Sequence, residues 1–220
     1  MFQIPQLFLN DPTSGIALIV SLIFSLSFHE FSHGFVAYRL GDNTAYKQGR
    51  LTLNPLAHLD PIGSLMILII GFGWAKPVPV NPMNLQNPEK DMIKVAFAGP
   101  AANFLLCLIG CMIVRNFGFI YNDYGTAINL NAVGNIFFFF SFINMMLGVF
   151  NMLPIYPLDG GQIFGGFIRK YNYNIEYNLR NYGPTVLMGI IFVNIIFGIS
   201  ILSYIFSPFF YVVKVLAGLS

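Results

Sequence analysis

Four apolar segments, each about as long as a lipid bilayer is thick, dominate this sequence. A spanning helix needs about 20 mostly apolar residues. The segments of this length are residues 15–40, 92–117, 132–154 and 184–206. Only 9% of the 220 residues are charged, whereas a soluble domain carries about 25%. We therefore expect an all-α polytopic membrane protein with the lipid bilayer as its solvent.

The chain is expected to form one domain over residues 1–220, because no linker, low-complexity stretch or internal repeat divides it. The formal net charge of +2 is too small to indicate a nucleic-acid partner. Cys107 and Cys111 lie four residues apart in one apolar segment. Metal binding by this pair is conceivable, but small packing residues in a membrane helix are the preferred interpretation.

A fifth apolar run, residues 61–73, is short for a full crossing, because as a helix it is only about 20 Å long. The distribution of basic residues indicates whether this run crosses the membrane or returns to the same side, since loops on the cytoplasmic side are enriched in Lys and Arg. If the run crosses, the two sides hold five and six basic residues; if it dips in and returns, they hold nine and two. We therefore expect a re-entrant segment, with the nine-residue face in the cytoplasm and the N-terminus outside.

The flanks of this run look extended, at residues 49–53 before it and 74–80 after it. An extended substrate peptide binds well to a sheet edge. Pro77 and Pro79 lack N–H groups on one edge, whereas Val78 and Val80 leave the other edge able to pair. We expect a small β segment here, between the first and second spans, with pairing to the strand of Arg50.

The first apolar segment contains His29, Glu30 and His33. Histidines at positions i and i+4 of a helix face the same way and can share one metal ion. A glutamate directly after the first histidine can accept a proton from a metal-bound water. Because ionisable residues inside a span are costly and mark function, the motif predicts a metal site rather than a polar patch that pairs helices.

A catalytic zinc takes three protein ligands and one open position, so a third ligand must come from elsewhere. The candidates are His58, Asp60 and Asp159, of which Asp159 is preferred. Asp159 follows a segment whose two prolines free the backbone to turn, and two glycines after it allow a close approach. The expected topology brings Asp159 to the depth of the histidine pair. The alternative for Asp159 is an N-cap of a helix over residues 162–171.

At these residues the chain resembles the site-2 protease family of intramembrane zinc metalloproteases, in a compact bacterial and archaeal branch without a PDZ domain. The motifs that carry the resemblance are His29-Glu30-x-x-His33, Gly99-Pro100-Ala101-Ala102-Asn103, the segment from Asn151 to Gly160, and the segments 49–63 and 76–82. The resemblance implies one zinc ion held by His29, His33 and Asp159. It also implies Glu30 as general base and a substrate contact by Asn151.

The expected function is that of a zinc-dependent endopeptidase of the cell membrane. It would have a three-helix catalytic core plus a C-terminal helix, and would cut membrane-embedded proteins or membrane-bound peptides near the cytoplasmic face. A metal transporter would need polar sites across the bilayer, and a di-iron hydroxylase would need many more than three histidines. A catalytically silent metal-binding protein stays an alternative. Neither the substrate nor the oligomeric state follows from the sequence.

Two residues keep open roles at this point. Asn151 shares a helical stripe with Ser141, Asn144 and Gly148, so it can contact substrate or join helices by a hydrogen bond. For Asn144 the bond between helices is preferred. His58 can orient the re-entrant segment, donate to the oxyanion or anchor the chain at the membrane interface.

Overall fold

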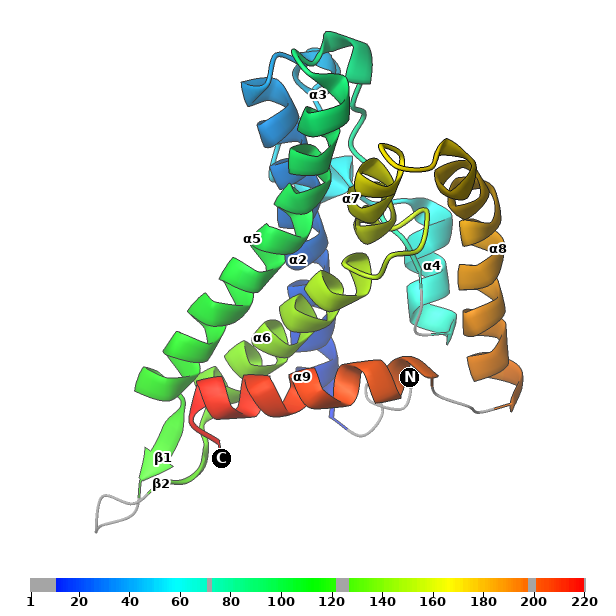
Figure 1. Cartoon of the computed structure of the whole chain (residues 1–220). Coiled ribbons are helices and arrows are strands. Elements are labelled where there is room, and N and C mark those ends of the chain that lie inside the picture. Colours follow the sequence, from blue (N-terminus) through cyan, green and yellow to red (C-terminus); the bar gives the residue numbers. More distant parts are fainter. Residues whose placement is uncertain (1–10, 71–72, 122–126, 198–200, 220) are drawn as a thin grey trace.

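The computed structural model describes residues 11–70, 73–121, 127–197 and 201–219, and these form a mostly helical protein of the expected class (Figure 1). The elements in chain order are α2 (Pro12–Arg39), α3 (Thr44–Lys47), η1 (Pro55–Ala57), α4 (Pro61–Ile70), η2 (Pro82–Asn84), α5 (Pro88–Phe117), β1 (Phe119–Tyr121), β2 (Ala127–Leu130), α6 (Ala132–Asn151), α7 (Asp159–Ile168), α8 (Tyr173–Phe197) and α9 (Ile201–Ala217).

Three helices in the described part of the chain are long and apolar enough to cross a membrane, namely α2, α5 and α6. They pack against one another in all three pairings. The protein is therefore a multi-pass membrane protein built on a three-helix core, as the apolar segments predict.

The observed helix ends differ from the ends of the apolar segments where a polar cap or a proline sets the end of a helix. α5 begins at Pro88, before the apolar residues, because Asn87 accepts a hydrogen bond from the backbone of Lys90 as the N-cap and proline suits the first helical position. α6 ends at Asn151 instead of 154, because Pro154 disfavours helical geometry in the residue before it.

The fourth expected span, residues 184–206, is replaced by parts of two helices. α8 begins at Tyr173 and ends at Phe197, and α9 begins at Ile201 and runs in a different direction (Figure 1). Pro184 lies inside α8 rather than at its start. The apolar-segment prediction did not include the first turns of α8, because these turns are polar. Glu176 in these turns is nevertheless buried.

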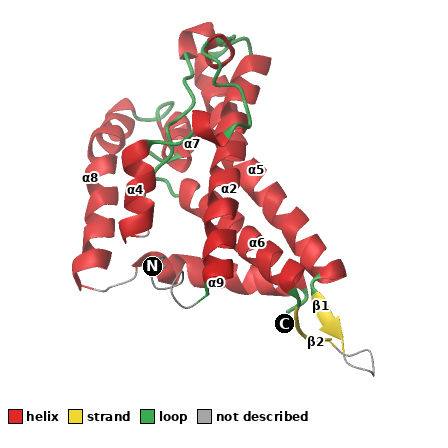
Figure 2. Ribbon diagram, turned by 180° about the vertical axis from the view of Figure 1, so that it is seen from behind, coloured by secondary structure: helices red, strands yellow, loops and turns green. Residues whose placement is uncertain are grey.

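The segment that contains the short helix α4 begins and ends at the same end of the molecule. Leu59 pairs with Ala75 in an isolated antiparallel bridge, and the N–H of Lys76 donates to the carbonyl of His58 at 2.8 Å. Figure 2 shows α4 from behind as a short helix beside α8. The two flanks of residues 61–73 thus lie together, which is the path that a re-entrant segment needs.

The small β structure lies elsewhere than expected. The two-stranded antiparallel sheet joins α5 to α6, with Phe119 opposite Leu130. Between α2 and α5, the described residues carry the single Leu59–Ala75 bridge instead of a strand pair. The expected pairing with the Arg50 strand is wrong, because the guanidinium of Arg50 itself donates to the carbonyls of Lys76 and Pro77, at 2.9 and 3.1 Å.

An apolar core is formed where α9 packs against α5 and α6. Cys107 and Cys111 are buried there and are not disulfide-bonded. They pack in one cluster with Val114, Met145 and Val213. The packing interpretation of the cysteine pair is therefore confirmed.

Candidate metal and catalytic site

Two histidines of α2 form the first part of the site. His29 and His33 are only 5% and 7% exposed, and one helical turn brings their Nε2 atoms to 3.0 Å from each other. Such a short distance between two ring nitrogens is favourable only if a proton or a cation lies between them.

The hydrogen bonds of the two Nδ1 atoms indicate which tautomer each neutral ring adopts. Nδ1 of His33 lies 2.7 Å from the carbonyl oxygen of Val95, which can only accept, so this nitrogen carries the proton. Nδ1 of His29 lies 2.6 Å from Oδ1 of Asn103. Both histidines thus use Nδ1–H as a donor, and each ring in its neutral form keeps a free lone pair on Nε2. This is the arrangement of histidines that ligate a metal through Nε2.

A polar network between three helices fixes the orientation of Asn103. Its amide nitrogen donates to Oδ1 of Asn144 at 2.9 Å, which leaves Oδ1 of Asn103 as the acceptor that faces His29. The amide of Asn144 in turn donates to Oγ of Ser25 at 2.8 Å. The preferred role of Asn144, a hydrogen bond between helices, is thereby confirmed.

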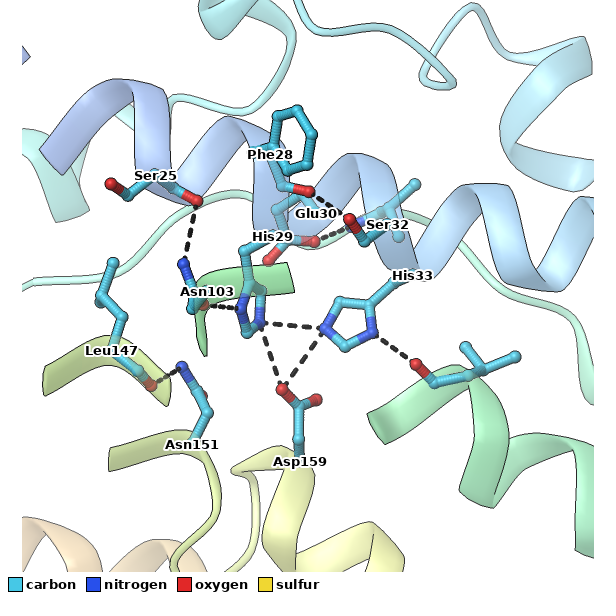
Figure 3. Close-up of polar contacts among 12 residues, drawn as sticks. Ser25, Phe28, His29, Glu30, Ser32, His33, Asn103, Leu147, Asn151 and Asp159 are labelled. Atoms are coloured by element: carbon cyan, nitrogen blue, oxygen red, sulfur yellow. Dashed lines mark hydrogen bonds and ion pairs between the residues drawn. The ribbon is translucent and has the colours of Figure 1, made fainter. Parts of the chain in front are cut away.

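Asp159, the first residue of α7, completes a triangle with the histidines (Figure 3). Its Oδ2 lies 3.1 Å from Nε2 of His29 and 3.3 Å from Nε2 of His33. Its side chain is 13% exposed. The alternative that Asp159 is a helix N-cap is wrong, because Leu158 occupies the N-cap of α7 and no side chain caps it.

The triangle fits a metal ion. Three ligand atoms around a tetrahedral zinc, each about 2.0–2.2 Å from it, lie about 3.3 Å apart. The observed separations are 3.0, 3.1 and 3.3 Å. Oδ2 of Asp159 is buried and has no hydrogen-bond donor among the described residues, and both Nε2 atoms of the neutral rings present lone pairs. Three acceptors facing one another need a cation between them.

Glu30 lies next to this group and has a partner that sequence reasoning did not foresee. The backbone N–H of Val78 donates to Oε2 of Glu30 at 2.7 Å. Val78 belongs to the extended segment that follows the α4 loop, and it is buried. At Val78, the edge that was expected to pair with the strand of Arg50 is thus bonded to the carboxylate of Glu30.

One face of α5 lines the site, through residues to which sequence reasoning assigned no role. Val95 and Asn103 bind the two histidines, and Gly99 lies between them. A Cβ atom at Gly99 would overlap Nε2 of His33 and the ring of His29. These three residues are four apart and share a helix face. That spacing, within the Gly99–Asn103 motif, is the signal that could have identified them.

The remaining candidates lie in other surroundings. Asp60 accepts from the N–H of Gly63 at 2.8 Å, as a cap of α4. His58 is 1% exposed, and its Nε2 lies 2.7 Å from the carbonyl of Thr52, at the base of the α4 loop. Asn151 donates from its amide to the carbonyl of Leu147 in its own helix, at 3.0 Å.

Comparison with protein families identifies relatives of this chain. The model of "Peptidase family M50" matches residues 117–193. The "Putative zinc metalloprotease YwhC" of Bacillus subtilis (strain 168) is 43% identical over 149 residues, which are 66% of this chain and 66% of the relative. The protein "Putative zinc metalloprotease Rip2" of Mycolicibacterium smegmatis is 35% identical over 150 residues, which are 66% of this chain and 54% of the relative. The chain thus spans between about half and two thirds of the length of these relatives.

A solved structure has the same fold. The "Site-2 Protease from Methanocaldococcus jannaschii" superimposes with a TM-score of 0.51 at 19% sequence identity, over 97% of this chain and 84% of that one. At this identity the likeness concerns the fold alone. It agrees with the three-helix core described above.

Proposed function

Because the chain belongs to the site-2 protease family of zinc metalloproteases, peptidase family M50, we propose that it is a zinc-dependent intramembrane endopeptidase. It would hydrolyse peptide bonds of membrane-embedded proteins or membrane-bound peptides near the cytoplasmic face. The observation that carries this proposal is the triangle of three lone-pair atoms from His29, His33 and Asp159, with the carboxylate of Glu30 beside it.

We assign one zinc ion to these three ligands. Asn103 and the carbonyl of Val95 hold the histidine rings in the orientation and tautomer that ligation requires. When bound, zinc lowers the pKa of a water in its open position and polarises the peptide carbonyl. Every other part of the reaction falls to side chains and backbone groups of this chain.

Glu30 is assigned as the general base. Its Oε2 is held by the N–H of Val78, so Oε1 is the oxygen to which we assign the proton of the attacking water. The same proton can then pass to the amine that leaves when the peptide bond breaks. A general base contributes about 10²–10⁴-fold to a rate when it is held within hydrogen-bond reach of the proton.

Asn151 remains a proposed substrate contact. Its amide carries two protons, of which the described bond to Leu147 uses one. The other is free to donate to a substrate carbonyl or to the developing oxyanion. His58 we assign to orienting the α4 loop, because it joins Thr52 and Lys76 at the base of this loop.

The active site is proposed to face the cytoplasm, with residues 61–73 re-entrant. The pairing of Leu59 with Ala75 supports this, since it keeps both flanks of α4 at one end of the protein. The positive-inside rule then assigns the end with nine basic residues to the cytoplasm. Reporters fused near Tyr121 and near Leu85 should lie on opposite sides of the membrane. Reporters on the same side would overturn this topology.

The proposal is tested by cleavage in membranes. The chain and its Glu30→Gln variant are each expressed with a single-span reporter whose helix contains a Gly-Pro pair near its cytoplasmic end, because a substrate helix must unwind before its carbonyls are accessible. Cleavage should be lost in the variant while zinc stays bound. Equal cleavage by both would end the protease assignment, and no cleavage by either would favour a silent metal-binding protein.

A further inference from the structure

A buried tyrosine lies three residues before Asp159, in the loop that connects α6 to α7. Tyr156 is 7% exposed, and glycines from two helices surround it. A Cβ atom at Gly161, Gly165 or Gly183 would come within 3.0 Å of Tyr156. The ring and its backbone therefore lie directly against α7 and α8, with no side chain between them.

The hydroxyl group of Tyr156 ends in a charged pair on α8. It donates to Oε1 of Glu176 at 3.1 Å. The guanidinium of Arg180 donates to the same oxygen from Nε at 3.0 Å and from Nη2 at 2.9 Å. Arg180 also lies over the Tyr156 ring, with its Cζ 5.1 Å from the ring centroid. Glu176 is only 4% exposed, so its charge depends on these partners.

This latch, composed of Tyr156, Glu176 and Arg180, acts on the part of the metal site that is held least firmly by local structure. His29 and His33 share one long helix, whereas Asp159 begins α7 directly after a loop with prolines at 154 and 157. An unanchored loop would lose conformational entropy each time Asp159 ligated a metal. Fixing the loop beforehand removes that cost and strengthens binding.

We infer that Tyr156 and Glu176 are positioning residues for Asp159, so that docking of α8 sets how tightly the site holds its metal. This inference rests on the proposed function, because it takes Asp159 as the third ligand. Neither residue touches the ligand triangle. The latch acts through the backbone of Pro157 and Leu158, the two residues between Tyr156 and Asp159.

The test measures metal binding rather than cleavage. Purified full-length chain in detergent is stripped of metal and titrated with Co²⁺ against a chelator, and the visible absorption of bound Co²⁺ reports the geometry of its ligands. Glu176→Ala removes the buried charge, and Tyr156→Phe removes only one hydroxyl. We expect about 10-fold weaker Co²⁺ binding for Glu176→Ala, which corresponds to the entropy lost when about one residue of loop backbone becomes ordered on metal binding. A smaller loss in the same direction and a changed absorption band are expected for Tyr156→Phe.

A latch that merely stabilises the fold is distinguished by two controls. Val213→Ala makes a cavity where α9 packs on the core, in a group of apolar residues that includes no residue of the latch, and should lower thermal stability without weakening Co²⁺ binding. In an Asp159→Ala background, Glu176→Ala should weaken Co²⁺ binding no further, because coupled residues are not additive.

Each outcome decides the inference. Wild-type affinity in both latch variants, with weaker binding in Asp159→Ala, would overturn the latch and leave the ligand set intact. Full additivity of Asp159→Ala and Glu176→Ala would likewise overturn it. Unchanged affinity in Asp159→Ala would overturn the ligand assignment itself, and the latch with it. If Glu176→Ala does not fold, Tyr156→Phe provides the same comparison.

Discussion

The backbone N–H of Val78 donates a 2.7 Å hydrogen bond to Oε2 of Glu30, across 48 residues of sequence. The same extended segment is anchored again further along, where the N–H of Asn81 donates to Oδ2 of Asp42 at 2.7 Å. The segment after the α4 loop is therefore held at two carboxylates, that of Asp42 between α2 and α3 and that of Glu30 in α2, the proposed general base.

The Val78–Glu30 bond predicts that a backbone donor orients the base. Val78→Pro removes this N–H, whereas Val78→Ala shortens the side chain and keeps it. We expect kcat for reporter cleavage to fall about tenfold or more in Val78→Pro relative to Val78→Ala, because a general base acts only within hydrogen-bond reach. Zinc content should match in both variants. Equal kcat values would show that the bond has no part in catalysis.

Asn103 is predicted to strengthen metal binding through His29. Asn103→Ala removes the acceptor of the His29 Nδ1–H bond, and loss of such a partner typically costs about 10–100-fold in metal affinity. Asn116→Ala is the matched control on the same helix, since within the described residues Asn116 is bonded to the Met112 carbonyl one turn back and to no histidine. Chelator competition measures both variants. A similar affinity in the two would contradict the role of Asn103.

Gly99 is predicted to be required for space alone. In Gly99→Ala the new methyl group meets both histidine rings, and overpacking of this kind costs about 1–3 kcal/mol. Zinc content should therefore fall. Gly189→Ala in α8 meets no atom within 4 Å and should retain zinc, with the same gain in helix propensity. Full zinc occupancy in Gly99→Ala would mean that the histidines do not lie against α5.

Asp42 is predicted to stabilise the protein in a pH-dependent way. Burial acts to raise the pKa of Asp42, but hydrogen bonds from Thr44, Asn84 and Asn81 outweigh burial and hold the pKa below its ordinary value. A lowered pKa in the folded state stabilises the protein above the unfolded value of about 3.9, and this stabilisation is lost as the pH falls through the folded pKa. Asp42→Asn should thus lower the thermal unfolding temperature at pH 7, and the difference should shrink at lower pH. A pH-independent difference would contradict this.

Local spacing and apolar length made much of this protein predictable. The three spanning helices follow from apolar length, because a bilayer core demands it. The face shared by His29 and His33 follows from helical periodicity. The preference for Asp159 as the third metal ligand was less direct. It depended on the count of basic residues, which placed the segment of Asp159 at the same end of the protein as the histidines.

Contacts between distant segments were not predictable in the same way. The bonds from Val78 to Glu30 and from Asn103 to His29 join residues 48 and 74 positions apart, and no local pattern encodes them. The start of α8 was missed because its polar turns are stabilised by burial of Glu176 against Tyr156. The strand pairing expected at Arg50 was wrong because its side chain, rather than its backbone, holds residues 76 and 77.

The central claim is that one zinc ion joins α2 to α7, and metal analysis of two purified variants tests it most directly. Asp159→Ala removes the ligand that comes from α7, and His58→Ala removes the third histidine of the chain, which lies at the base of the α4 loop. We predict one zinc per chain in the wild-type protein and in His58→Ala, and a large loss in Asp159→Ala. Zinc lost from His58→Ala and retained in Asp159→Ala would contradict the site.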